Sequence, residues 1–78
     1  MTHKLKTLPE FWDAVKSGEK TFEVRRNDRN FMVGDTLELI RHADSDERII
    51  TCEITYVLTG GQFGIEPGYS VLGLGSIK

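Results

Sequence analysis

The feature that most constrains this chain is a change in the spacing of its apolar residues at Gly18. Before Gly18, apolar residues recur at helical spacing. They are Leu8, Phe11, Trp12 and Val15. Pro9 stands where a helix can begin, and Gly18 can adopt the left-handed conformation that ends one after Ser17. After Gly18, apolar and polar residues alternate. The sequence therefore predicts one short helix followed by strands.

Alternation divides the rest of the chain into strands, which polar or glycine-rich turns separate. We expect strands at His3–Thr7, Thr21–Arg25, Thr36–Leu39, Ile50–Leu58 and Tyr69–Leu74. In the longest of them, the predicted apolar face consists of Ile50, Cys52, Ile54, Tyr56 and Leu58. One helix and about five short strands predict an α+β fold that is mainly β, a small and strongly curved sheet or barrel with the helix against it.

Length and composition limit the chain to a single domain, residues 1–78. Folding at this size buries about 63% of the unfolded surface, enough for one small core. The chain is 38% apolar and 28% charged, which is typical of a soluble, ordered domain. It shows no signal-peptide pattern and no membrane-spanning run, and Cys52 alone excludes an internal disulfide. We therefore expect a cytoplasmic monomer without a membrane partner.

Charge is distributed unevenly along the chain. The net charge of −2 combines +2 over residues 1–30 with −4 over residues 31–78. Proteins that coat long nucleic-acid duplexes are usually strongly basic, so this class is disfavoured. The distribution allows a basic face suited to a short strand, a nucleotide or another small anion. An ordinary solvated surface would give the same pattern.

The segment from Gly18 to Arg25 contains the candidate site. Lys20, Glu23 and Arg25 place two cations around one carboxylate at the predicted helix-to-strand junction. Glu23 and Arg25 share a strand face, so their charged groups can project into the same space. Such a cluster leaves spare N–H donors for a phosphate or a base edge. The alternative is an ordinary exposed ion pair that contributes little to stability.

These residues form the pattern G-x-K-x-x-E-x-R, which resembles the signature of the ASCH (activating signal cointegrator homology) domain in the PUA-like superfamily. The whole chain also resembles short bacterial and phage proteins of unknown function within that superfamily. The resembling stretches are His3–Lys6, Phe11–Val15, Gly18–Arg29, Phe31–Leu37, Ile54–Leu58 and Glu66–Leu74. Their order along the chain is more specific than any one of them.

The resemblance implies a small β-barrel of about five to six strands whose N-terminal helix covers one opening. It also implies RNA or nucleotide binding in a cleft. The expected ligand-binding residues are Gly18, Lys20, Glu23, Arg25, Arg26 and Tyr69. For stacking on a base, Trp12, Phe63 and Tyr69 are the large aromatic candidates, although Trp12 fits the core better.

A second hypothesis is catalysis, because some members of the superfamily are amidohydrolases of modified cytidine or nucleases. The amidohydrolases use a lysine followed three residues later by a threonine, and a glutamate further on. Here Lys20 is followed by Glu23 at that position, while Thr21 is out of register and Glu66 is the only downstream acid to consider. Lys20 and Glu23 could instead act as an acid–base pair.

A third hypothesis is a protein-interaction module that presents an acidic face. That face would comprise Glu38, Asp44, Asp46, Glu47 and Glu53. We expect no cofactor and no metal, because His3 and His42 show no ligand-like spacing. Cys52 is expected to be a buried, unreactive thiol, and the glycine-rich loop 60–64 a flexible lid.

Overall fold

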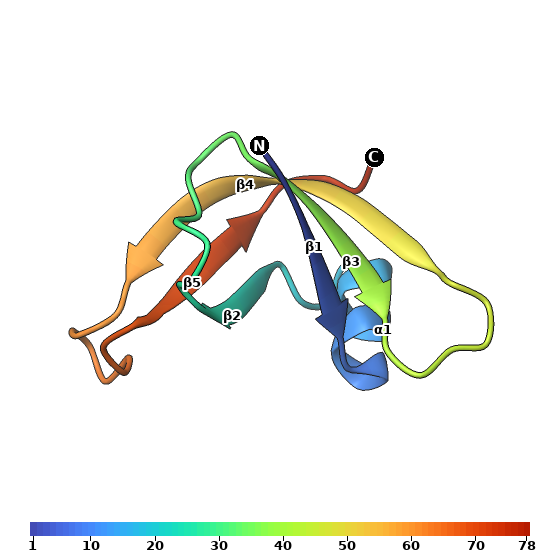
Figure 1. Ribbon diagram of the computed structural model, residues 1–78, viewed down its shortest axis with the longest axis horizontal. Coiled ribbons are helices and arrows are strands. Elements are labelled where there is room, and N and C mark those ends of the chain that lie inside the picture. Colours follow the sequence, from blue (N-terminus) through green and yellow to red (C-terminus); the bar gives the residue numbers. More distant parts are fainter.

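The computed structural model describes residues 1–78 as one helix and five strands (Figure 1). The elements are β1 (Thr2–Thr7), α1 (Pro9–Ser17), β2 (Phe22–Arg26), β3 (Thr36–Arg41), β4 (Ile49–Thr59) and β5 (Tyr69–Leu74). They form one sheet in the order β1-β3-β4-β5-β2. β1 runs parallel to β3, and the other pairs are antiparallel. The expected small, mainly β fold with one short helix is confirmed.

The sheet curls into a half-barrel because its longest strand, β4, belongs to two differently oriented parts (Figure 1). Residues 49–53 of β4 pair with β3, and residues 54–59 pair with β5. We call β1, β3 and residues 49–53 the helix wing, since α1 packs beside β3 there. We call β2, β5 and residues 54–59 the second wing. β1 and β2 are the two edges, and no strand pairing joins them.

The core lies on the inner side of this curved sheet. It consists of Leu5, Trp12, Val15, Phe31, Leu37, Leu39, Ile50, Cys52, Ile54 and Leu72. The Trp12 indole N–H donates to the Leu39 carbonyl at 2.8 Å, which satisfies its one polar group in the apolar surroundings. The helix is thereby fixed to β3, and the prediction that Trp12 belongs to the core is confirmed.

The helix begins and ends where the sequence predicts. Gly18 adopts the left-handed conformation with φ of 85°, and its N–H donates to the Val15 carbonyl. Only part of the predicted apolar face is buried, because Leu8 and Phe11 remain exposed. α1 falls short of the length and apolarity that a membrane crossing requires.

The prediction of one continuous apolar face along residues 50–58 is wrong beyond Ile54. The pairing register between β4 and β5 shifts between Ile54 and Tyr56, as in a β-bulge. An extra residue reverses which side chains point inward. Val57 consequently packs against the core, while the Tyr56 side chain is 65% exposed.

Candidate ligand-binding site

The candidate site is built on β2, in which charged side chains point into the protein and apolar side chains point outward, the reverse of an ordinary amphipathic strand. Glu23 is only 3% exposed, whereas the apolar Phe22 and Val24 are 45% and 52% exposed. Because side chains alternate along a strand, Arg25 shares the inner side with Glu23. The alternative of an ordinary exposed pair at Glu23 and Arg25 is therefore wrong.

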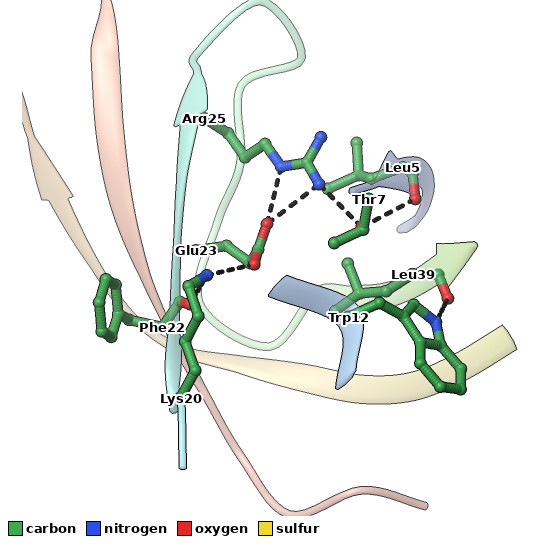
Figure 2. A network of polar contacts seen from close by, with 8 residues as sticks. All are labelled: Leu5, Thr7, Trp12, Lys20, Phe22, Glu23, Arg25 and Leu39. Atoms are coloured by element: carbon green, nitrogen blue, oxygen red, sulfur yellow. Dashed lines mark hydrogen bonds and ion pairs between the residues drawn. The ribbon is translucent and has the colours of Figure 1, made fainter. Parts of the chain in front are cut away.

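Glu23 is held between two cations (Figure 2). The Lys20 ammonium donates to Glu23 Oε1 and, at 2.7 Å, to the carbonyl of Phe22. Arg25 Nε donates to Glu23 Oε2 at 3.0 Å, and Arg25 Nη2 lies 3.0 Å from the same oxygen. The structure thus brings the three predicted site residues into one network, and both carboxylate oxygens are engaged.

The network bridges the seam between the edge strands β1 and β2. Arg25 Nη2 donates to Thr7 Oγ1 of β1 at 2.9 Å, and the buried Thr7 hydroxyl donates to the Leu5 carbonyl at 3.3 Å (Figure 2). Beyond β2, Arg29 Nη1 donates to the Lys4 carbonyl at 2.8 Å. Side chains therefore connect the two edges at the place where the backbone leaves the half-barrel open.

Lys20 also lies between two aromatic rings. Its ammonium is 5.3 Å from the Phe11 ring centroid and 4.9 Å from that of Phe22, within the range of cation–π attraction. A pocket of about 360 Å³ reaches Lys20 and Thr21. Its other lining residues are Val15, Gly18, Leu74, Gly75, Ser76 and Ile77. Gly18 therefore lies beside Lys20, and its role in ligand binding stays a prediction.

A further polar group lies beside Arg25 on the neighbouring strand. Ser70 of β5 is directly opposite Arg25, so their Cβ atoms are about 5 Å apart and share the inner side. Ser70 is fully buried, and its hydroxyl has no hydrogen-bond partner. An unpaired buried hydroxyl costs free energy. Ser70 therefore adds to the energetic cost of the polar groups that converge around Arg25.

The chemistry of the network favours binding over proton transfer. A base must be free to take up a proton, but both oxygens of Glu23 already accept hydrogen bonds. Arg25 Nη1 makes no hydrogen bond and remains a donor. Glu66, the downstream acid of the hydrolase hypothesis, lies in the exposed loop between β4 and β5, outside this network.

The remaining predicted ligand-binding residues do not join the network. Arg26 is exposed and lies opposite Tyr69 on the outer side of the second wing. Phe63 is 85% exposed in the 60–68 loop, and Trp12 is enclosed in the core. The stacking role that the sequence suggested for Trp12 is therefore wrong, while the roles of Tyr69 and Phe63 stay predictions.

Sequence reasoning missed Thr7 and Ser70. Both are polar residues at inward positions of strands, and Thr7 continues the inward series of His3 and Leu5. The alternation along β1 is the only feature of the sequence that predicts an inward-pointing Thr7. Its contact with Arg25 depends on the approach of the two edge strands, which local sequence does not record.

His3 and Asp35 form a separate polar contact in the helix wing. The His3 Nε2 atom lies 2.8 Å from Asp35 Oδ2, and the His3 ring packs edge-on against Phe31. The hydrogen bond with His3, with those from the Met32 amide and the terminal ammonium, lowers the pKa of Asp35 to about 2. This contact secures β1 to the turn before β3. No three His, Cys, Asp or Glu side chains form a group that could hold a metal ion.

The acidic residues of the hairpin between β3 and β4 are partly neutralised. Arg41 pairs with Asp13 at 2.9 Å and with Asp44 at 2.6 Å, while Arg48 pairs with Asp44 at 2.7 Å. The bond from Arg41 lowers the pKa of Asp13, and the bond from Arg48 lowers that of Asp44. Asp44 is therefore not a free charge on an acidic docking face.

Cys52 is fully buried at the centre of the inner side, as predicted. Burial raises the pKa of its thiol, and the nearby Glu23 carboxylate raises it further. A thiol with a raised pKa is a weak nucleophile. We therefore still predict that Cys52 is unreactive.

Comparison with known protein families gives one match. A family model described as "Domain of unknown function (DUF3850)" matches residues 2–74. No curated protein matches the chain. The matched range begins with the first residue of β1 and ends with the last residue of β5, so it contains the whole sheet and the candidate site.

Proposed function

This chain belongs to the DUF3850 family, a domain of unknown function, and we propose that it binds a nucleotide, either free or within single-stranded RNA. The observation that carries the proposal is the buried Glu23 carboxylate, clamped by Lys20 and Arg25 at the seam between β1 and β2. Arg25 Nη1 supplies a free donor there.

The cost of this arrangement supports a role in binding. Removing charges from water is expensive, and well-packed apolar residues of similar volume often stabilise a protein as well or better. A buried carboxylate with two cations is therefore a poor choice for stability alone. It is a good choice for holding donors in a fixed direction before a ligand arrives.

The groups present match those of a nucleotide. Arg25 can donate to a phosphate oxygen or a base carbonyl, and Lys20 can neutralise a phosphate. A carboxylate offers about four acceptor positions, and Glu23 accepts two hydrogen bonds, one from Lys20 and one from Arg25 Nε, while Arg25 Nη2 forms an ion-pair contact with the same Oε2 atom. A remaining position can accept from the exocyclic amino group of a base.

We also propose that this fold is a PUA-like barrel related to ASCH domains. The support is the meeting of Lys20, Glu23 and Arg25, the three charged positions of G-x-K-x-x-E-x-R, in one network. In this proposal, the side chains that connect β1 and β2 complete the barrel in place of a backbone ladder. A cytoplasmic location, where nucleotides and RNA occur, belongs to the same proposal.

The test is to measure binding of the four ribonucleoside 5′-monophosphates by calorimetry. We expect Arg25→Ala to weaken binding of the preferred one by about 1–3 kcal/mol, because the charge-assisted hydrogen bond from Arg25 Nη1 is lost. Arg26→Ala is the matched control, since Arg26 is the neighbouring arginine on the outer side. Unchanged affinity in folded Arg25→Ala would refute the proposal, as would the absence of binding by the unmodified protein.

The dependence of nucleotide binding on salt concentration tests the role of Lys20. Salt screens the attraction between Lys20 and a phosphate, so Lys20→Ala should flatten the dependence of log Kd on log salt concentration. Titrations of both proteins at several salt concentrations would measure the two slopes. Equal slopes would exclude contact between Lys20 and phosphate.

A further inference from the structure

The outer side of the second wing is unusually apolar for an exposed surface. Its outward positions are Phe22, Val24, Arg26, Tyr56, Leu58, Tyr69, Val71 and Gly73. Three of these side chains are largely exposed, with Tyr56 at 65%. Arg26 is the one charged residue of the set, and none is acidic. Exposed apolar patches of this kind mark interaction sites.

The outer side of the helix wing gives the contrast. Its strands present charged and polar residues outward. Lys4 of β1 lies opposite Glu38 of β3, which in turn lies opposite Thr51 of β4. That surface is typical of a sheet face in contact with water. The helix wing also presents Ile49 outward, so the two outer sides differ chiefly in the acidic residues and mixed charges that the second wing lacks.

The strand register places two aromatic residues in one row of the outer side. Phe22, Gly73 and Tyr56 lie in one row across β2, β5 and β4. The backbones that carry the two rings are about 10 Å apart, since neighbouring strands are separated by about 4.8 Å. The space over Gly73 is filled by its neighbours, because Thr55 Oγ1 and Tyr56 Cβ would lie 3.2 and 3.3 Å from a Cβ atom there, so a base would stack on the exposed surface of either ring.

This outer surface is continuous with the candidate site at β2. The Lys20 ammonium binds Glu23 on the inner side and lies 4.9 Å from the centroid of the Phe22 ring, which belongs to the outer side. Lys20 therefore lies at the edge that separates the two surfaces. Arg26, beside Tyr69, supplies a second cation two rows away from Phe22.

We infer that the second wing binds single-stranded RNA, which places one nucleotide at the Lys20–Glu23–Arg25 network and stacks following bases on Phe22 and Tyr56. This inference rests on the proposed function, selects single-stranded RNA as the ligand and adds a second surface along which the strand continues. Aromatic rings with nearby cations and no acids bind single strands, because every base has a stacking face and every linkage a negative charge.

A second copy of the chain fits this surface less well. Stable interfaces bury about 800 Å² and involve roughly 20–30 residues on each partner. The outward positions of the second wing number far fewer, and among the apolar ones only Phe22, Val24 and Tyr56 are exposed. A symmetric dimer through this patch would also bury Arg26 without an acid in the patch to pair with it.

The experiment compares the preferred ribonucleoside monophosphate with RNA homo-octamers of the same base. We expect the octamer to bind at least tenfold more tightly than the monophosphate, and Tyr56→Ala to remove most of that gain while monophosphate binding is unchanged. Tyr56→Phe should retain the gain, since the ring remains. Ile49→Ala is the matched control, an exposed apolar residue of the same strand in the helix wing.

The outcomes separate the two proposals. An octamer that binds no more tightly than the monophosphate, or a gain that survives Tyr56→Ala, would overturn the inference and leave the proposed function intact. An octamer whose binding depends on Tyr56 but not on Arg25 would refute the proposed function instead. Dimerisation that sedimentation detects and Tyr56→Ala abolishes would assign the surface to a second copy and overturn the inference.

Discussion

The two wings of the sheet use the same strand alternation for opposite purposes. In the helix wing, Leu37 and Leu39 point inward, where Trp12 packs. In the second wing, Glu23 points inward and Phe22 points outward. The first arrangement is what stability requires, and the second costs stability at a place where polar groups converge. The helix wing and α1 supply most of the core residues, and the contrast is the basis of our proposal that the second wing binds the ligand.

The largest expected effect concerns the core of the helix wing. Leu39→Ala should lower the free energy of unfolding by about 2–5 kcal/mol, because it removes a fully buried side chain and leaves a cavity. Val24→Ala, at an exposed apolar position of the second wing, should change it by less than about 0.5 kcal/mol. Urea unfolding of the two variants measures both values. Similar losses would remove the distinction between the wings.

A smaller effect is expected from breaking the charged network of the second wing. Glu23→Ala leaves Lys20 and Arg25 without their shared partner, and should cost about 2–3 kcal/mol. This is below the usual cost for a fully buried pair, because both cations are partly exposed to water. The same unfolding measurement applies, and a cost near zero would show that the network is not held in place.

Replacing the whole network sharpens the comparison. The triple variant Lys20→Met, Glu23→Leu, Arg25→Met should be about as stable as the unmodified protein, because no charge is left unpaired. It should nevertheless lose nucleotide binding. A large loss of stability in this variant would mean that the network serves the fold, as the residues of the helix wing do.

The smallest expected effect is a change with pH in the contribution that Asp35 of the helix wing makes to the free energy of unfolding. Because the folded pKa of Asp35 is lowered to about 2, its contribution to stability is present above its ordinary pKa of 3.8 and is lost as the pH falls toward 2. The stability difference between the unmodified protein and Asp35→Asn should therefore shrink over that interval. Unfolding by urea at a series of pH values measures it, and a difference that stays constant would contradict the assignment.

The sequence was sufficient to predict the helix, the strands and the three charged members of the network, but not Thr7. Pro9 and Gly18 define the helix by local conformational preference, and the spacing of Glu23 and Arg25 places them on one face. Alternation does not reveal which face of a strand is inside, so the burial of Glu23 required the fold. The shift at Tyr56 and the contact between Arg25 and Thr7 are likewise set by strand pairing over long distances in the chain.

The most direct test of the central claim is an amide NMR titration of the labelled protein with the four ribonucleoside 5′-monophosphates. We predict saturable shifts that cluster at Lys20, Glu23 and Arg25 and extend across the seam to Thr7 and to Ser70. These shifts should disappear in the triple variant while the rest of its spectrum stays that of a folded protein. Shifts confined to other parts of the molecule, such as the hairpin between β3 and β4, or no shifts at all, would contradict the account.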